Sequence, residues 1–338
     1  MTTPQPLVFF TICSKNFLAY ARTLCASVRE SHPGARFYVA LCDRLDGMVD
    51  PRAEPFDILE LEALGIEALG EMIARYNITE LNTAIKPFVF ERLFDLGHTR
   101  VVYLDPDILV VSPLEDVERR LGVDVDAVLT PHVLHPAENV PTDDVKMLQY
   151  GIYNLGFVAF HGTPQVREIV RWWGRRLERE CVIDLAQGLF VDQKWADLLP
   201  SYIPRTLILH HCGYNLAYWN ILQRRVTRTA AGWRVNGDTP LVFAHFSGND
   251  FARPEIFSRH SPRLSPDEVG EAMVLLAEYR ERVFANGHAH YSTLPYAFDW
   301  NGASGRNEHT PRPASQAVVA PVAQAAPAPS AVPQLETR

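Results

Sequence analysis

The stretch that decides the fold is RVVYLDPDILVV, which runs from Arg100 to Val111. Its first five residues are β-forming and mostly apolar, so they predict a buried strand that ends at Asp105. Asp105 and Asp107 then place two carboxylates at the carboxyl end of that strand, the edge at which open α/β sheets bind ligands. Close carboxylates need a cation, a shared proton or water between them. Carboxylates with water and phosphate oxygens suit Mg²⁺ or Mn²⁺, so the pair predicts a metal site.

The same triplet has a plainer interpretation, an Asp-Pro turn without a ligand. A second Asp-x-Asp triplet at Asp124–Asp126 shows that this pattern alone is not specific for a metal site. That triplet leads into the apolar run 127–129, and we interpret it as the polar start of a strand. The position of Asp105 and Asp107 after a strand favours the metal interpretation for this pair.

The fold class follows from the order of apolar runs and helical patterns. Before Arg100, strand-like runs at 7–13, 37–42 and 56–61 alternate with helical patterns at 16–30, 66–76 and 79–96, the last capped by Thr79. This alternation predicts an α/β protein with a mostly parallel central sheet flanked by helices. The second half is more mixed, with expected strands at 126–130, 153–160, 207–210 and 241–246, helices at 164–180 and 265–286, and a hairpin at 226–235.

Composition bounds the domain organisation and the partners. The chain has 338 residues, of which 47% are hydrophobic, and this is ample for a large core. We expect a main domain over residues 1–260, a helical extension packed on it over 261–302, and a disordered Ala/Pro-rich tail over 303–338. A formal charge of −8 disfavours nucleic acid as a partner.

The cysteines and the apolar runs indicate the compartment. Five scattered cysteines include no Cys-x-x-Cys pair, which signals neither a zinc site nor a disulfide framework, and reduced thiols fit a cytoplasm. No signal peptide is visible, and no apolar run approaches the ~18 residues of a membrane span. We therefore expect a cytoplasmic protein, with the inner face of the membrane as an alternative.

Several familiar site motifs are missing from the sequence. It contains no Gly-x-Gly-x-x-Gly, no Gly-x-x-x-x-Gly-Lys-Ser/Thr and no Gly-x-Ser-x-Gly, which disfavours the dinucleotide, P-loop and serine-hydrolase classes. His245 ends the apolar run 241–245. A lone histidine of this kind is more often a satisfied core residue. As a third ligand beside Asp105 and Asp107, it would favour Mn²⁺ over Mg²⁺.

A family resemblance is carried by four segments: Val101–Val110, Tyr153–Phe157, Asp192-Gln193 and His245–Gly248. Together they resemble the nucleotide-sugar glycosyltransferases with the GT-A fold, in particular the retaining family of glycogenin and bacterial lipooligosaccharide galactosyltransferases. Bacterial polysaccharide-locus glycosyltransferases are similar in part. Val101–Val110 resembles the strand and metal motif of the family, and Tyr153–Phe157 resembles its Phe-Asn-x-Gly segment. Asp192-Gln193 and His245–Gly248 resemble its Asp-Gln pair and its His-x-x-Gly motif, and all four come in the family's order.

The resemblance implies a role for each site residue. Asp105, Asp107 and His245 would hold Mn²⁺ or Mg²⁺, and Asp192 and Gln193 would lie at the reacting sugar. Thr11, Lys86, Asn154 and Arg253 would contact the donor, a nucleotide-sugar that is UDP-linked in most of the family. Two departures stand out. The family usually has an acidic residue or Asn near the first strand, where this chain has the segment Thr11–Asn16. Arg253 follows two residues later than the family's Lys.

The implied activity is transfer of a sugar, with retention, to a glycan or lipid-linked acceptor of the cell envelope. If the enzyme inverts instead, Asp192 is the natural general base. Two other classes stay open: a metal-dependent nucleotidyltransferase or phosphohydrolase, and a non-catalytic carbohydrate-binding protein.

Three further features each have two interpretations. Lys86 could contact the diphosphate or be a solvated helix cation. The segment His210–Asn220 is either a sugar-binding loop or a packed, hydrogen-bonded one. The third feature is a stripe of four arginines, Arg167, Arg171, Arg175 and Arg179. It is either a contact for a membrane surface or an acidic partner, or a solvated face neutralised by Glu168, Glu178 and Glu180.

Overall fold

The computed structural model describes residues 5–136 and 143–298. The tail expected over 303–338 lies outside the described residues. The domain boundary near residue 260 stays a prediction.

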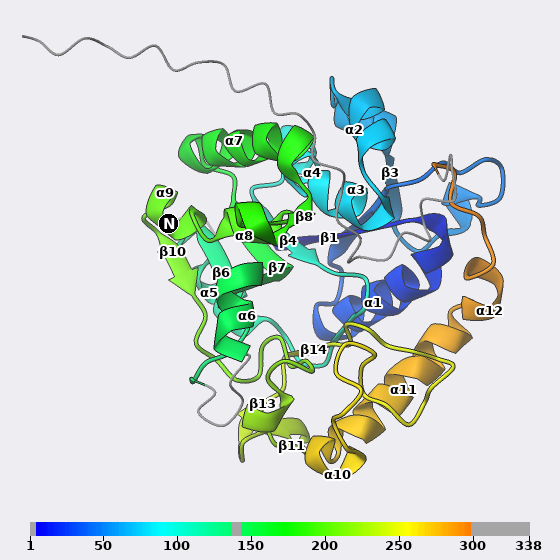
Figure 1. Cartoon of the computed structure of the whole chain (residues 1–338), viewed down its shortest axis with the longest axis vertical. Coiled ribbons are helices and arrows are strands. Elements are labelled where there is room, and N and C mark those ends of the chain that lie inside the picture. Colours follow the sequence, from blue (N-terminus) through cyan, green and yellow to red (C-terminus); the bar gives the residue numbers. More distant parts are fainter. Residues whose placement is uncertain (1–4, 137–142, 299–338) are drawn as a thin grey trace, which may run out of the picture. The chain divides into compact units, whose positions relative to one another are not determined.

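A seven-stranded sheet organises the described part of the chain, in the order β10-β6-β7-β4-β1-β2-β3 (Figure 1). Its strands are β1 (Val8–Cys13), β2 (Arg36–Leu41), β3 (Asp57–Glu60), β4 (Arg100–Leu104), β6 (Ala127–Pro131), β7 (Tyr153–His161) and β10 (Thr206–Ile208). Only β7 runs against its neighbours, and the other strand pairs of this sheet are parallel. The predicted α/β class, with a mostly parallel sheet flanked by helices, is confirmed.

Alternate residues of the strands face two separate cores, as the two-residue period of a strand requires. Phe9 and Val102 belong to one core, which α1 (Leu18–Ser31) and α11 (Ala272–Ala285) cover. Phe10 and Val101 belong to the other. Four helices cover this second core: α2 (Leu69–Arg75), α3 (Ile78–Ala84), α4 (Lys86–Asp95) and α7 (Pro164–Glu180). Because both faces are buried, the strands read as continuous apolar runs in the sequence.

The remaining elements are short. The helices are α5 (Glu115–Arg120), α6 (Asp143–Tyr150), α8 (Gln193–Ala196), α9 (Leu199–Tyr202), α10 (Pro266–Val269) and α12 (His288–Tyr291). The strands are β5 (Ile108–Val110), β8 (Ile183–Asp184), β9 (Leu189–Phe190), β11 (Val226–Thr229), β12 (Gly232–Val235), β13 (Thr239–Pro240) and β14 (Phe243–His245). The 3₁₀ turns are η1 (Lys15–Phe17), η2 (Pro51–Ala53), η3 (Leu61–Leu64), η4 (Leu185–Gln187) and η5 (Ile221–Gln223). The hairpin predicted over 226–235 is confirmed as β11 and β12, which pair antiparallel.

Two helices that the sequence predicted as continuous are each divided. The segment 79–96 forms α3 and α4, which meet at Ile85, and Pro87 lies in the first turn of α4 where its missing N–H costs nothing. The predicted cap Thr79 is wrong, because Asn77 caps α3 and forms a capping box with Glu80. The segment 265–286 is interrupted by Gly270, whose φ of 62° ends α10.

A two-stranded ribbon outside the main sheet positions the site. The strand β14 pairs antiparallel with β5, and His245 lies opposite Ile108. The N–H of Phe246 donates to the carbonyl of Asp107 at 3.0 Å. This pairing brings a residue from the second half of the chain beside the Asp-Pro-Asp turn that follows β4.

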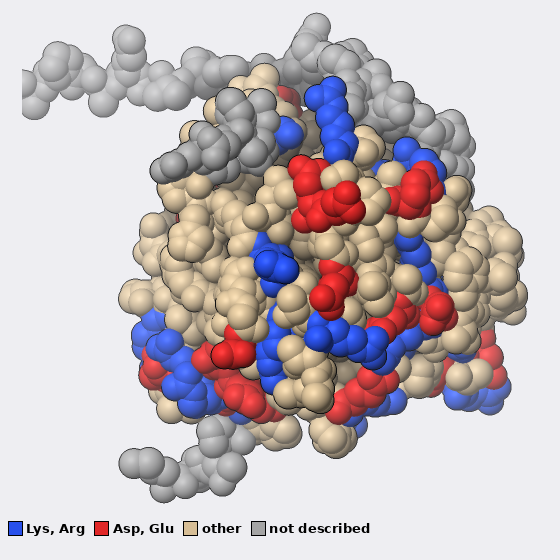
Figure 2. Space-filling model, turned by 90° about the horizontal axis from the view of Figure 1, so that it is seen from below, with Lys and Arg blue, Asp and Glu red and all other residues tan. Residues whose placement is uncertain are grey.

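The C-terminal helices of the described chain pack on the first half. The ring of Tyr279 on α11 stacks on Phe246 with centroids 4.6 Å apart, and Asn286 donates to the hydroxyl of Thr23 on α1 at 3.0 Å. None of the helices within the described ranges is both long and apolar enough to cross a bilayer. On the face seen in Figure 2, Lys and Arg side chains lie beside Asp and Glu side chains, without a large area of one sign among the described residues.

Candidate metal centre

The Asp-Pro-Asp turn leaves the sheet at the end of β4. The N–H of Asp105 donates to the carbonyl of Gly156 on β7 at 2.8 Å, and the N–H of Ile108 closes the turn on the carbonyl of Asp105 at 3.1 Å. The carboxylates of Asp105 and Asp107 are 29% and 23% exposed. The triplet is therefore a turn, as the plainer interpretation held, and it also presents both acids at the carboxyl edge of the sheet.

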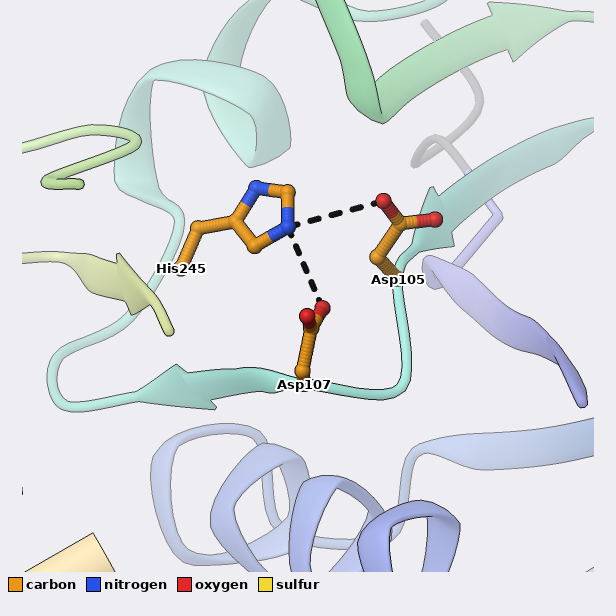
Figure 3. A group of neighbouring side chains, drawn as sticks. All are labelled: Asp105, Asp107 and His245. Carbon is orange, nitrogen blue, oxygen red and sulfur yellow. Dashed lines mark ion pairs between the residues drawn. The ribbon is translucent and has the colours of Figure 1, made fainter. Parts of the chain in front are cut away.

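His245 meets both acids (Figure 3). Its Nε2 lies 3.1 Å from Oδ1 of Asp107 and 3.6 Å from Oδ2 of Asp105, and one ligand atom of each residue lies within 4.8 Å of the other two. Adjacent ligands of an octahedral ion with bonds of about 2.1 Å lie about 3 Å apart, so the group fits a small divalent cation. Two carboxylates with one imidazole suit Mn²⁺ or Mg²⁺. Within the described ranges, this is the one group of three such side chains.

The charges of the three groups are strongly linked. Burial raises the pKa of Asp105, and the positive charges of Lys86 and His245 only partly oppose this effect. Burial lowers the pKa of His245, but the charge and hydrogen bond of Asp107, together with the charge of Asp105, raise it above its usual value overall. The group therefore attracts positive charge.

Lys86 is buried beneath this group, so its interpretation as a solvated helix cation is wrong. Its side chain is 2% exposed, and its Nζ lies 2.5 Å from Oδ2 of Asp192, 2.9 Å from the carbonyl of Leu155 and 4.2 Å from the centre of the Tyr103 ring. Burial raises the pKa of the equally buried Asp192, and Lys86 opposes that rise. The structure thus joins two residues that the sequence assigned to the same site, 106 positions apart.

Tyr103 is a member of the site that the sequence analysis did not identify. Its hydroxyl donates to Oδ1 of Asp105, which leaves Oδ2 of that carboxylate facing His245. A signal was available, because residues two apart on a strand share a face. Tyr103 therefore sets the direction of the first acid.

Asn154 and Gln193 also lie here, and both are buried. Oδ1 of Asn154 is 3.2 Å from Nδ1 of His245, and the amides of Asn154 and Gln193 are 3.4 Å apart. The structure therefore brings seven of the predicted site residues into one connected cluster: Lys86, Asp105, Asp107, Asn154, Asp192, Gln193 and His245.

Thr11 and Arg253 are not brought into this cluster. Thr11 is fully buried in β1, and its hydroxyl has no hydrogen-bond partner among the described residues. Arg253 is exposed and pairs with Asp250 at 2.8 Å. Their assignment to the donor stays a prediction.

The segment 210–220 forms a packed loop. Asn215 and Asn220 are fully buried. The amide of Asn220 donates to the carbonyls of His132 and Asn215, both at 2.9 Å. The Trp219 ring stands edge-on to His245, with centroids 5.2 Å apart. Buried hydrogen bonds of this kind hold the loop in place beside the site.

The arginine stripe on α7 is only partly paired, and its partners differ from those expected. Arg167 pairs with Glu91 and Asp95, and Arg171 pairs with Glu91, so the acids belong to α4. Of the three acids expected from α7 itself, Glu180 pairs with Arg176, a residue outside the stripe.

Comparisons with known proteins find distant similarities. No family model matches the chain. Solved structures similar to it over most of its length are glycosyltransferases, the class that the four sequence motifs resemble.

One of these is the galactosyltransferase LgtC in complex with donor and acceptor sugar analogues. It is 14% identical with a TM-score of 0.49, and the match covers 85% of this chain and 97% of that chain. Another is mouse xyloside xylosyltransferase 1, which is 12% identical with a TM-score of 0.42, covering 71% and 97%. By sequence, the chain is 23% identical over 245 residues to the uncharacterized protein YfnF of Bacillus subtilis (strain 168), a match that covers 71% of this chain and 80% of YfnF.

Proposed function

We propose that this protein is a metal-dependent glycosyltransferase of the GT-A type, which moves a sugar from a nucleoside-diphosphate sugar to a glycan or lipid-linked acceptor. The observation that carries the proposal is the convergence of Asp105, Asp107 and His245 at the carboxyl edge of the sheet. The order of the four sequence motifs supports it, since each contributes a residue to the same cluster.

The proposed chemistry centres on the departing diphosphate. A divalent ion, when bound, supplies the positive charge that offsets the charge developing on the leaving group. Asp105 and Asp107 would provide two of the ligand oxygens, and His245 would provide a nitrogen. Tyr103 keeps the free oxygen of Asp105 turned toward them. The protein's part is to hold these groups in place before the substrate arrives, so that little reorganisation accompanies the reaction.

Lys86 and Asp192 would act on the sugar side of the site. Because Lys86 lies 2.5 Å from Asp192, it would hold this carboxylate in one position on the sugar side of the site. We propose retention of the anomeric configuration and a UDP-linked donor, both implied by the family resemblance.

The test is a donor panel with defined cofactors. Calorimetry with UDP- and GDP-sugars, each with and without Mn²⁺, identifies the donor, and nucleotide release with and without added glycan acceptors measures transfer. Asp107→Asn should abolish Mn²⁺-dependent donor binding, whereas Asp124→Asn, at the exposed first acid of the second triplet, should leave it unchanged. Equal nucleotide release in the presence and absence of every acceptor would favour a phosphohydrolase instead. Donor binding that is indifferent to Mn²⁺ and to Asp107→Asn would contradict the proposal.

The proposed setting is the cytoplasmic face of the membrane, where a lipid-linked acceptor would lie. The arginine stripe on α7 is the candidate contact for an anionic membrane surface. Arg171, one of its members, is half-exposed and pairs with Glu91. Co-sedimentation with vesicles that contain anionic lipids, at low and high salt, tests this setting independently of the reaction.

A further inference from the structure

The amide of Asn154 lies at the centre of a buried hydrogen-bond network beside His245. Backbone groups fix the direction of this amide. The N–H of Gly156 can only donate, and it lies 3.2 Å from the Asn154 atom assigned as Oδ1. At the other end, Nδ2 lies 3.4 Å from Oε1 of Gln193. That oxygen is fixed in turn, because Gln193 donates to the carbonyl of Tyr150 at 2.9 Å and accepts from the N–H of Leu155 at 3.2 Å.

The direction of the amide decides which nitrogen of His245 carries hydrogen. Oδ1 of Asn154 can only accept, and Nδ1 of His245 lies 3.2 Å from it, so Nδ1 carries a hydrogen and donates. The other nitrogen, Nε2, then faces Asp107 and Asp105. Since both acids are acceptors, Nε2 must either carry a second hydrogen or share a cation with them, and a bound metal ion would be that cation. Metal-bound histidines are commonly fixed in this way by a partner on the second nitrogen.

Packing holds the ring in the same orientation. A Cβ added to Gly156 would lie 2.4 Å from Cε1 and 2.7 Å from Nδ1 of His245, and 2.8 Å from Oδ1 of Asn154. These separations are far below contact distance, so only glycine leaves room for the imidazole at this place. From the other side, the edge-on ring of Trp219 confines it.

The loop 210–220 completes the network. Asn215 has a φ of 58° and is fully buried, and its Nδ2 donates to Oδ1 of Asn154 and to the hydroxyl of Thr130, both at 3.1 Å. Nδ2 of Asn154 also faces Nε2 of His132 at 3.4 Å. Oδ1 of Asn154 thus faces three donors and its Nδ2 faces two acceptors, which uses the whole bonding capacity of the amide.

We propose that Asn154 is a positioning residue for the metal centre, and that Asn154, Gly156 and Asn215 hold His245 with Nε2 toward the ion. This inference rests on the metal centre of the proposed function. It differs from the donor-sugar contact implied by the sequence, because a fully engaged amide has no group left for a sugar hydroxyl. The two roles predict different results in the absence of any donor.

The experiment measures Mn²⁺ affinity of the full chain without nucleotide-sugar, for wild type, Asn154→Ala and Gly156→Ala. Loss of an outer partner of a metal-bound histidine typically weakens metal binding by about 10- to 100-fold, and this is the expected loss for both variants. Gly70→Ala is the matched control, since Gly70 lies in α2 and a Cβ there has no neighbour within 4 Å. Circular dichroism confirms that each variant is folded, and Gly156→Ala tests the proposal if Asn154→Ala is not.

A second readout locates the hydrogen directly. Long-range ¹⁵N–¹H spectra of the Mg²⁺-loaded wild type should show the His245 hydrogen on Nδ1. Hydrogen on Nε2 would overturn the inference. The inference would also be overturned if the folded variants bound Mn²⁺ within twofold of wild type but bound the donor more weakly. That result is the pattern expected of a sugar contact. Failure of the wild type itself to bind Mn²⁺ would instead overturn the metal centre, and with it the proposed function.

Discussion

Replacing Lys86 with Met tests the buried ion pair beneath the candidate metal centre. Methionine keeps the length of the side chain and suits a helix, but it removes the ammonium group. Three interactions are lost: the contact with Asp192 at 2.5 Å, the hydrogen bond to the carbonyl of Leu155, and the position of the ammonium group over the Tyr103 ring. Asp192, 2% exposed, would be left as an uncompensated buried charge.

The expected cost is large because the surviving partner cannot reach water. Breaking a buried pair by removing one partner typically costs about 3–5 kcal/mol, out of an unfolding free energy of about 5–15 kcal/mol for a whole domain. Asp192→Asn in the same chain removes the stranded charge, so the double variant should be more stable than Lys86→Met alone. Burial already raises the pKa of Asp192 and Lys86 opposes this rise, so the carboxyl of the single variant should take up a proton more readily.

The sign of the pH dependence follows. A carboxyl whose pKa is higher in the folded state than in the unfolded state binds more protons when folded, so its contribution to stability is lost as pH rises. The deficit of Lys86→Met relative to wild type should therefore be larger at pH 8 than at pH 5. Urea unfolding followed by the fluorescence of the six tryptophans measures all three chains. A single variant within about 1 kcal/mol of wild type, or a double variant less stable than the single one, would refute this reasoning.

Three other variants test neighbouring features. Tyr103→Phe removes the hydroxyl that donates to Asp105, so Mn²⁺ binding measured by calorimetry should weaken by about tenfold. An unchanged affinity would show that the hydroxyl does not orient this carboxylate. Arg280 donates to the side chain of Asn249 and to the backbone carbonyls of residues 250, 254 and 256. Arg280→Lys should therefore speed amide hydrogen exchange across 247–259 and lower the unfolding free energy by about 1–3 kcal/mol. Unaltered exchange in this segment would contradict that role. Burial lowers the pKa of His132 to about 4. As pH falls from 6.5 to 4, the unfolding free energy of the wild type should therefore drop by up to about 3 kcal/mol relative to that of His132→Gln. Parallel curves of unfolding free energy against pH would count against this shift.

The sheet and the position of the acids were predictable from local pattern. Strands buried on both faces appear in the sequence as continuous apolar runs, and Asp105 directly follows such a run. The two errors at α3 also had local signals. The pattern Asn77-x-x-Glu80 is a capping box, and Pro87 marks the start of a helix more readily than its interior.

Contacts between distant segments were beyond what local pattern can predict. A lysine on an amphipathic helix has the same sequence signature whether it is solvated or buried against Asp192, so the burial of Lys86 depends on a partner far along the chain. The pairing of β5 with β14 was not predicted. That His245 could meet the acids was suggested by its position at a strand end and implied by the family resemblance. The network around Asn154 draws on separate segments near residues 132, 193, 215 and 245, and no spacing within one segment reveals it.

The central claim, that Asp105, Asp107 and His245 converge on one ion, is tested most directly by electron paramagnetic resonance of bound Mn²⁺. Titration should give one tight Mn²⁺ per chain for wild type and for Asp124→Asn, and binding at least about tenfold weaker for Asp107→Asn. Spin-echo spectra should show one imidazole nitrogen bound to the ion, with the coupling changed by ¹⁵N-histidine labelling and absent in His245→Ala. Bound Mn²⁺ without a nitrogen ligand, or equal affinity in wild type and Asp107→Asn, would contradict the account.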